Sequence, residues 1–584
     1  MAVENLITEH IDIWTSAVKT RSTSGRGSSK KLELYGVKKL RELILELAVR
    51  GKLVPQDPND EPAAVLLERI AAEKAQLVKE KKIKKQKSLE QVSKGEELFD
   101  TPTGWAWTRI SEIAEISPRN STTDDDAEVS FVPMPLITTN YDGSHGSEKR
   151  IWKEIKKGYT HFQDGDIALA KITPCFENSK AAVFSGLEGG VGAGTTELHV
   201  ARPLSDCINP LFVLLYLKAP IFLKVGETKM TGSAGQKRVP KDFFSENPLP
   251  FPPRKEQHRI VAKVDELMTL CDQLEQQTEA SIEAHQVLVT TLLDTLTNSA
   301  DANELMQNWA RISEHFDTLF TTEESIDQLK QTILQLAVMG KLVPQDPSDE
   351  PAAELLKRIA EEKAQLVKEK KIKKEKALPP ISEDEKPFEL PSGWVWCRLQ
   401  DITSKITDGD HKTPPRIEAG YTLLSAKNVR DGFIDFSTTD FISEDDYMKS
   451  RERCLPEHND LLIVSVGGTI GRSSLVPKKS DFALVRSVAL IKPLKFNSEY
   501  LKHAMDSKLL QDSIHNNKRG GAQPCLYLSE ISKFPFTMPP LEEQNRIVLK
   551  INQLLAICES LKLQIQESQV TQFHLTDAIV EQAV

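Results

Sequence analysis

The chain carries one long segment twice, and this internal repeat constrains its fold more than any other feature. Residues 44–87 match residues 333–376 at 37 of 44 positions, at a constant offset of 289. The match resumes between 252–274 and 539–561, at an offset of 287. This period is far longer than the roughly 20–50 residues of a solenoid repeat. The sequence therefore predicts two large units, about 1–300 and 306–584.

The first copy contains an insertion. Residues 7–13 match 312–318 at an offset of 305, so about sixteen extra residues lie in the first copy. The segment KTRSTSGRGSSKK (19–31) is the obvious insertion. Its glycine, serine and basic residues predict a flexible loop.

The repeated segments are predicted to be helical. In VKKLRELILELAV (37–49) apolar residues recur every three or four positions, which gives one apolar helical face. Gly51 stands where a helix ends in the left-handed conformation. After a turn rich in proline and aspartate, a second helix is predicted to begin near Pro62, in a run of strong helix formers.

The segments after the two PP..EQ.RIV strings carry a narrower apolar pattern. Their apolar residues step by three and four in alternation, as at the a/d seam of a coiled coil. We predict an intramolecular antiparallel pair of helices, the alternative being that each stripe packs on its own domain. A helix over 254–296 would span about 60 Å at about 1.5 Å per residue. The seam residues are Ile260, Val264, Leu267, Cys271 and Leu274, then Ile547, Ile551, Leu554, Cys558, Leu561 and Ile565, and both cysteines are interpreted as small buried hydrophobes.

The two middle regions share an order of elements and not a sequence. Strands are predicted within 165–174 and 195–203 in the first, and within 459–476 and 482–493 in the second. A helical patch follows in each, at 209–226 and 497–514, and then a Gly-rich polar loop, at 231–240 and 516–530. The glycines of SVGGTIGRS (465–473) predict a tight turn and not a phosphate cradle. A common scaffold with different surfaces is what two recognisers of different targets need.

No motif for catalysis is present in the sequence. It contains no P-loop, G-x-S-x-G elbow, H-E-x-x-H string or NPPY-like adenine-methylation motif. Seven single cysteines without a C-x-x-C pair signal neither a disulfide framework nor a zinc site, and a reducing cytoplasm is the simplest compartment. No apolar run is long enough for a membrane helix, and the N-terminal residues do not form a signal peptide. His10 and His315, beside Glu9 and Glu314, are interpreted as packing or capping residues, although a metal or acid–base role is conceivable.

Charge leaves nucleic-acid binding open. The net charge of −10 argues against a basic nucleic-acid footprint, but the two middle regions are about neutral. The lysine runs KEKKIKKQK (79–87) and KEKKIKKEK (368–376) favour a solvated helix end over a phosphate contact.

Several ordered motifs together resemble one known family. They are LAVRGKLVPQDP (47–58), LPSGWVWCRL (390–399), FQDGDIALAKITPCFENSKAA (162–182) and PPLEEQNRIVLKINQL (539–554). With the duplicated plan, they make the chain similar to the specificity subunits of bacterial type I restriction–modification enzymes over essentially its whole length.

The resemblance implies an α+β fold with a pseudo-twofold internal repeat. Two globular mixed α/β target recognition domains would be separated by long antiparallel helices that are conserved between the copies, a coiled-coil spacer. The expected regions are an N-terminal helical region (1–100), recognition domain 1 (101–252), a central helical region (253–389), recognition domain 2 (390–539) and a C-terminal helix (540–584).

The resemblance also implies the function. Each recognition domain would read one half of a bipartite, asymmetric double-stranded DNA target, and the helices would fix the gap between the halves. Two modification subunits would bind S-adenosylmethionine and methylate adenine N6, and restriction subunits would use ATP and Mg²⁺. This chain itself would bind no cofactor and no metal and would have no active site. The repeated segment, 44–87 and 333–376, would then form the same docking surface for each of two identical partner subunits.

Base readout needs hydrogen-bonding side chains on loops, with Arg or Lys for guanine and Asn or Gln for adenine. Some of the chosen residues are expected to contact phosphate only. The candidates in the first middle region are Lys171, Thr173, Glu177, Asn178, Lys180, Ser233, Gln236, Lys237 and Arg238. Those in the second are His411, Lys412, Lys427, Asn428, Arg430, Thr469, Arg472, Lys518, Arg519 and Gln523.

Two other classes of protein remain as alternatives. The chain could be an enzyme such as a nuclease, with a magnesium site that the sequence hides. It could also be a coiled-coil scaffold or adaptor with two protein-binding domains, which the negative net charge favours. Cleavage by the purified chain, or sequence-specific retention of duplex DNA, would separate them.

Overall fold

The computed structural model describes residues 3–22, 30–85, 89–121, 123–233, 235–479, 481–521 and 523–584. The chain divides into two compact units, and the division differs from the predicted one near residue 300. Unit 1 comprises Met1–Ser281 with Ser568–Val584, and unit 2 comprises Ile282–Glu567. The difference arises because two long helices, α10 (Arg254–Thr297) and α19 (Leu541–Ala583), each contribute residues to both units.

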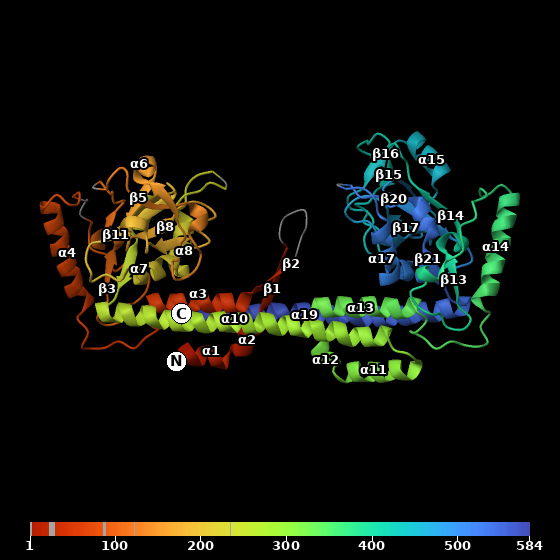
Figure 1. Ribbon diagram of the computed structural model, residues 1–584, viewed down its shortest axis with the longest axis horizontal. Coiled ribbons are helices and arrows are strands. Elements are labelled where there is room, and N and C mark those ends of the chain that lie inside the picture. Colours follow the sequence, from red (N-terminus) through yellow and green to blue (C-terminus); the bar gives the residue numbers. More distant parts are fainter. Residues whose placement is uncertain are drawn as a thin grey trace. The chain divides into compact units, whose positions relative to one another are not determined.

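Unit 1 begins with helices, continues into a strand-rich domain and returns to helix (Figure 1). Its helices besides α10 are α1 (Val3–Glu9), α2 (Ile11–Ser16), α3 (Tyr35–Val49), α4 (Ala63–Lys79), α5 (Ile110–Ile113), α6 (Trp152–Ile155), α7 (Pro210–Lys218), α8 (Pro220–Lys229) and α9 (Lys241–Glu246), with 3-10 turns η1 (Met134–Leu136) and η2 (Glu188–Gly190). Its strands are β1 (Val18–Ser22), β2 (Lys30–Leu34), β3 (Ala106–Arg109), β4 (Ala114–Ile116), β5 (Glu128–Val132), β6 (Glu148–Ile151), β7 (Thr160–Gln163), β8 (Ile167–Ala170), β9 (Ala181–Val183), β10 (Val191–Gly194), β11 (Leu198–Pro203) and β12 (Pro248–Phe251).

Unit 2 has the same order of parts. Its helices besides α19 are α11 (Ala302–Glu314), α12 (Phe316–Leu319), α13 (Glu323–Val338), α14 (Ala352–Lys368), α15 (Glu444–Arg453), α16 (Ser498–Asp506), α17 (Lys508–Asn517) and α18 (Leu528–Lys533), with 3-10 turns η3 (Glu383–Glu385) and η4 (Leu399–Ile402). Its strands are β13 (Val395–Arg398), β14 (Thr403–Asp408), β15 (Tyr421–Leu424), β16 (Asp440–Ile442), β17 (Leu461–Val464), β18 (Ser473–Leu475), β19 (Phe482–Leu484), β20 (Val488–Pro493) and β21 (Pro535–Met538).

Corresponding sheets occur in both units. The strand order β4-β11-β8-β9 in unit 1 corresponds to β14-β20-β17-β18 in unit 2, and the neighbours in each are antiparallel. A second sheet in each holds one parallel pair, β5 with β10 and β15 with β19. The central strands β8 and β17 are buried at every position, which explains their unbroken apolar sequences IALA and LLIV.

The predicted strands lie where expected, with one informative break. The segment 482–493 forms two strands, β19 and β20, separated by the turn Val485–Ser487. The segment 465–473 is a turn between β17 and β18, as predicted, and Gly467 and Gly471 have positive φ there. The helical patch 209–226 is split into α7 and α8 where Pro220 begins the second helix.

The insertion does not form the predicted loop throughout. Residues Val18–Ser22 and Lys30–Leu34 pair as the antiparallel strands β1 and β2, in register from Val18–Leu34 to Ser22–Lys30. The prediction was wrong here because Gly and Ser at 24–29 mask the hairpin signal of their flanks, and residues 23–29 themselves lie outside the described residues.

The repeated helices end in the same way. In unit 1, the Lys52 backbone N–H donates to Leu47 O at 3.0 Å, which closes the C-terminal turn of α3 around Gly51 at φ +69°. A Cβ on Gly51 would lie 2.5 Å from Pro102, so glycine is needed both for the backbone angle and for the contact. Gly340 has the same φ and meets Pro391 at 2.5 Å in unit 2.

The predicted seam residues are largely buried. In unit 1, Ile260, Val264, Leu267 and Cys271 are at most 1% exposed and Leu274 is half-buried; burial also raises the pKa of Cys271 to about 11. In unit 2, Ile547, Ile551 and Cys558 are at most 1% exposed, and Leu554, Leu561 and Ile565 are half-buried.

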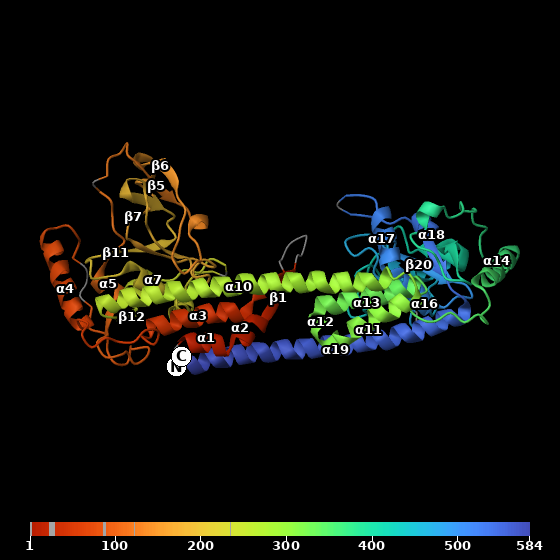
Figure 2. The same cartoon turned by 60° about the horizontal axis from the view of Figure 1, so that its bottom comes forward.

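Each seam lies on a helix that has a close neighbour within its unit. Arg41 of α3 pairs with Asp272 at 2.7 Å and Glu275 at 2.6 Å on α10. Figure 2 shows α3 running beside α10. On α19, Lys562 pairs with Asp327 of α13 at 3.2 Å. These ion pairs place α3 beside α10 and α13 beside α19. The pairing of α10 with α19 stays a prediction.

A buried glutamine in each unit joins the strand-rich domain to its long helix. Gln257 of α10 is 0% exposed; its Oε1 accepts the Asn209 N–H at 2.8 Å and its Nε2 donates to Pro252 O at 3.0 Å. Asn209 is the N-cap of α7, so the glutamine fixes the start of that helix. In unit 2, Gln544 bonds Asn497 N–H and Pro539 O in the same way, both at 3.0 Å. This is the physical reason for the glutamine in the PP..EQ.RIV string.

Candidate nucleic-acid interface

In unit 1, the loop after β8 and the Gly-rich loop are held together by backbone hydrogen bonds. Thr173 N–H donates to Lys237 O at 3.0 Å, and Val239 N–H donates to Lys171 O at 2.8 Å. The sequence separates these segments by more than sixty residues, and the structure brings three of the predicted residues together: Lys171, Thr173 and Lys237.

The Gly-rich loop of unit 1 closes on itself and carries an ion pair. Thr231 and Arg238 exchange backbone hydrogen bonds of 3.0 and 2.8 Å. The Arg238 guanidinium bonds both carboxylate oxygens of Glu197, at 2.8 and 2.9 Å, and holds the pKa of that carboxyl below its usual range. Glu197 precedes β11, and its carbonyl accepts the Lys171 N–H at 3.0 Å. Three segments therefore meet at this ion pair.

The predicted residues of unit 1 differ in how much their side chains are available. Asn178, Ser233, Gln236 and Lys237 are exposed, and Lys171, Thr173, Glu177, Lys180 and Arg238 are half-buried. The Lys180 ammonium donates to Met134 O at 3.0 Å, so it anchors its own loop. Lys218 of α7, 3% exposed, donates to Ser179 O at 2.8 Å and supports the same loop from beneath.

Unit 2 has the same backbone arrangement with other side chains. Gly467 N–H donates to Pro524 O at 2.9 Å, and Leu526 N–H donates to Ser465 O at 2.8 Å. These bonds join the loop after β17 to the Gly-rich loop 519–525. Thr469 and Arg472, in the same loop after β17, are half-buried.

The Gly-rich loop of unit 2 presents polar and basic residues. Arg519 and Cys525 close it with backbone bonds of 2.9 and 2.7 Å. Lys518, Arg519 and Gln523 are exposed, and Arg519 approaches Glu530 at 3.7 Å. This loop can offer one neutral amide and two cations to a ligand.

His411 belongs to a cluster that the sequence does not reveal. Its Nε2 lies 3.1 Å from the Asp408 carboxylate and 2.8 Å from the Arg453 guanidinium, and Arg453 also pairs with Asp408 at 2.7 Å. Arg453 comes from the end of α15 and Asp408 from the end of β14. Lys412, next to the cluster, is exposed.

The turn 425–430 requires one correction. Asn428 is 0% exposed; its Oδ1 accepts the Ser425 N–H at 3.0 Å and its Nδ2 donates to Asp435 O at 3.0 Å. Its prediction as a base-reading residue is therefore wrong, because the amide is used inside the turn. Of its neighbours, Lys427 pairs with Asp440 at 3.1 Å and Arg430 approaches Asp435 at 3.4 Å.

Arg486 was missed by the sequence reasoning. It lies in the turn Val485–Ser487, is exposed and makes no ion pair among the described residues. Its backbone N–H donates to Asp410 O at 3.0 Å, and Ser465 N–H donates to Ser487 O at 2.9 Å. The turn thus connects the His411 cluster to the loop after β17. The segment reads as one apolar strand, so only the isolated arginine in FALVRSVAL could have signalled the turn.

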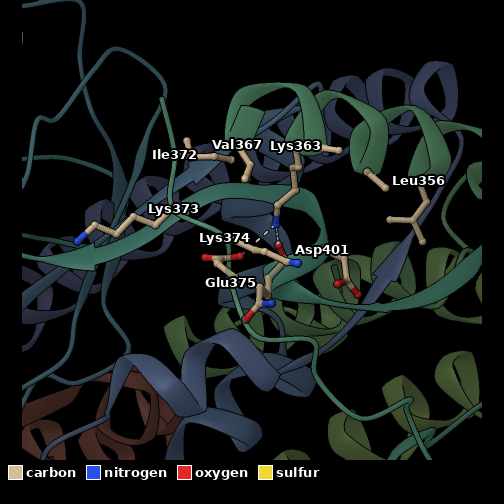
Figure 3. Close-up of a pocket in the computed structure, with 11 residues that line it drawn as sticks. Leu356, Lys363, Val367, Ile372, Lys373, Lys374, Glu375 and Asp401 are labelled. Carbon is tan, nitrogen blue, oxygen red and sulfur yellow. Dashed lines mark hydrogen bonds and ion pairs between the residues drawn. The ribbon is translucent and has the colours of Figure 1, made fainter. Parts of the chain in front are cut away.

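A cavity of about 440 Å³ lies between α14 and η4, lined by Leu356, Lys363, Glu375 and Asp401 among others (Figure 3). The Lys363 ammonium donates to Gln400 O at 2.7 Å and pairs with Glu375 at 3.2 Å, so its charge is used within unit 2.

His10 and His315 stand at helix junctions. The His10 carbonyl accepts the backbone N–H groups of Ile13 and Trp14 in α2, and the His315 carbonyl accepts those of Thr318 and Leu319 in α12. No group of three or more His, Cys, Asp or Glu side chains suited to hold a metal occurs in the part of the chain that the structure describes. None of the described helices combines the length and the apolar character needed to cross a bilayer.

Comparison with known proteins identifies the family. A model of the type I restriction modification DNA specificity domain matches residues 102–284 and 413–568, the parts that carry the two loop faces. The chain belongs to the family of type I restriction–modification specificity subunits. It is 55% identical over 591 aligned residues to the type I restriction enzyme EcoAI specificity subunit of Escherichia coli, and 52% identical over 604 residues to the EcoEI specificity subunit, with 100% of each chain covered.

Two solved structures resemble the chain more distantly. A chain from a type I R-M system complex matches with 18% identity and a TM-score of 0.48, over 83% of this chain and 98% of that one. The HsdS subunit from Thermoanaerobacter tengcongensis matches with 18% identity and a TM-score of 0.41, over 84% and 98%.

Proposed function

We propose that this chain selects the DNA sequence for a type I restriction–modification complex, and that each unit reads one half of a bipartite, asymmetric target. The observation that carries the proposal is the repeated backbone framework. In both units the loop after the central strand is bonded to the Gly-rich loop, while the side chains on the two faces differ. Base edges are distinguished by such side chains, and a common framework presents both sets in the same way.

The chain is proposed to act without catalysis of its own. In this reading, two modification subunits bind S-adenosylmethionine and methylate adenine N6 in each half, and restriction subunits use ATP and Mg²⁺. The pseudo-twofold repeat supplies each modification subunit with the same docking surface. The long helices α10 and α19, which contribute to both units, set the number of base pairs between the half-sites.

Methylome mapping tests the proposal. A restriction-deficient host would carry this chain with its cognate modification subunit, and a matched host would lack this chain. We expect a split motif with one methylated adenine in each half, lost when the chain is omitted. Exchange of residues 101–252 for those of another specificity subunit should change one half only. An assembled complex without a split motif would favour the scaffold alternative.

A further inference from the structure

The backbone bonds of the two Gly-rich loops give these loops a common register. Lys237 O and Pro524 O occupy the same place, because each accepts a hydrogen bond from the third residue of the loop after the central strand. The residues immediately before these carbonyls are Gln236 and Gln523. Two glutamines 287 positions apart in the sequence therefore occupy equivalent positions in the two loops.

The polar side chains around the two glutamines are not shared. The carbonyls of Glu197 and Ser487 each accept the N–H of the first residue in the loop after the central strand, which aligns these two residues as well. The equivalent pairs that differ are Lys171 and Ser465, Thr173 and Gly467, Glu197 and Ser487, Lys237 and Pro524, and Arg238 and Cys525. Charge, size or hydrogen-bonding capacity changes at every one of these pairs, whereas the glutamine is kept.

The fold does not account for this glutamine. Both side chains are exposed, and neither side-chain amide has a hydrogen-bond partner in the described parts of the two units. The loops are closed by the backbone bonds of Thr231 with Arg238 and of Arg519 with Cys525, which need no glutamine side chain. The glutamine is retained although its side chain makes no structural contact and its neighbours have changed. This points to a ligand feature that is common to both sites.

The chemistry of the amide indicates which feature of the ligand the two sites share. Glutamine is neutral, so it contributes little to the electrostatic binding of phosphate, which lysine and arginine supply. Its amide donates and accepts side by side and matches the N6 and N7 edge of adenine. If the function proposed above holds, the two half-sites differ in their bases but each contains one adenine that receives a methyl group.

We propose that Gln236 and Gln523 contact the adenine–thymine pair that carries the methylated adenine, one glutamine in each half-site, while that pair is still stacked in the duplex and before the adenine is extruded for transfer. The residues that differ between the loops read the bases that differ between the half-sites. Gln236 and Gln523 are positioning residues for methyl transfer, since the transfer itself takes place on the modification subunits.

The test uses the full chain assembled with its modification subunits. The variants are Gln236→Ala and Gln236→Glu, with Gln523→Ala as the mirror case; the glutamate keeps the shape of the side chain but cannot donate as an amide does. The substrates are duplexes of the motif that the unchanged chain confers, and further duplexes with one base pair replaced at a time. Methyl transfer is measured separately in each half-site, and circular dichroism checks that the variants are folded.

We expect both Gln236 variants to slow methyl transfer in one half-site by roughly five- to a hundredfold, the loss of one bidentate base contact. The other half-site is the internal control and should keep its rate, and the preference at non-target base pairs should not change. Gln523→Ala should give the mirror result.

Three results would overturn the inference: unchanged rates, relaxed preference at a base pair other than the target, or equal weakening on all sequences with a smaller salt dependence. The last would identify a phosphate contact. Failure of the proposed function is a different result, since the unchanged chain would then confer no split motif at all.

Discussion

Replacement of Gln257 by leucine should loosen the attachment of the strand-rich domain to α10. The side chain is fully buried, and leucine has a similar volume but can satisfy neither Asn209 N–H nor Pro252 O. An unsatisfied buried backbone group costs about 1–3 kcal/mol. With two such groups, one of them only partly buried, we expect the local opening free energy to fall by about 2–4 kcal/mol.

Hydrogen–deuterium exchange of the full chain measures this loss. At about 1.4 kcal/mol per tenfold change, amides of α7 (Pro210–Lys218) should exchange roughly 30- to 800-fold faster in Gln257→Leu. Amides of α16 in unit 2 should not change, and Gln544→Leu should reverse the pattern. Gln276→Leu, on an exposed position of α10, is the matched control. A folded Gln257→Leu variant with α7 exchange within twofold of the unchanged chain would refute the reasoning.

Three further perturbations follow from buried groups in unit 1. Burial lowers the pKa of Lys218 from 10.5 to about 7, so the unfolded chain binds the proton more tightly than the folded chain does. The free energy of unfolding should therefore rise with pH between about 7 and 10.5. Lys218→Met should remove this rise and increase the free energy of unfolding at pH 6, as urea titration can show. The Asp166 carboxylate is 1% exposed and accepts hydrogen bonds from Arg202 at 2.8 and 2.9 Å. Asp166→Ala leaves the arginine unpaired and should lower the free energy of unfolding, measured by calorimetry, by about 3–5 kcal/mol. The apolar double variant Asp166→Leu with Arg202→Met should recover most of this loss. A Cβ on Gly36 would lie 2.2 Å from Trp14 O, so Gly36→Ala should lower the Tm by several degrees, whereas Gly95→Ala, which meets nothing within 4 Å, should not.

Each of these has its own contrary result. A wild-type stability that is flat from pH 7 to 10 would mean that the Lys218 amine is not desolvated. Equal losses for Asp166→Ala and for the apolar double variant would mean that the pair itself, and not an unpaired arginine, carries the energy. Equal Tm values for the Gly36 and Gly95 variants would mean that the backbone near Trp14 can shift to accept the methyl group without a loss of stability.

The elements of the fold could largely be predicted from local patterns. The apolar strands β8 and β17, the helix stop at Gly51 and the buried seam positions on α10 and α19 all follow from spacing alone. These features depend on residues that are close in the sequence. The spacing of the apolar residues is therefore enough to predict them.

The candidate site depended on contacts that no local pattern contains. Asn428 has the chemistry of an adenine reader, but bonds to Ser425 and Asp435 consume its amide. His411 is bound by Arg453 from a helix forty-two residues later. Arg486 was hidden because a buried strand and the first residues of a turn have the same apolar composition. Only the three-dimensional pairing distinguishes a free polar side chain from one that is already satisfied.

The division of the chain also bears on its synthesis. Tyr35 of α3 packs its ring 5.0 Å from Phe573 and donates its hydroxyl to Asp577 at 2.8 Å, both in the part of α19 that belongs to unit 1. The ribosome makes residues 568–584 only after the whole of Ile282–Glu567 has been made. Unit 1, although first to emerge, is therefore the last to acquire all of its partners, and its apolar helix face stays uncovered while unit 2 is translated. A contact of this sequence separation delays the final step of folding, so loss of residues 568–584 would damage the unit that is made first.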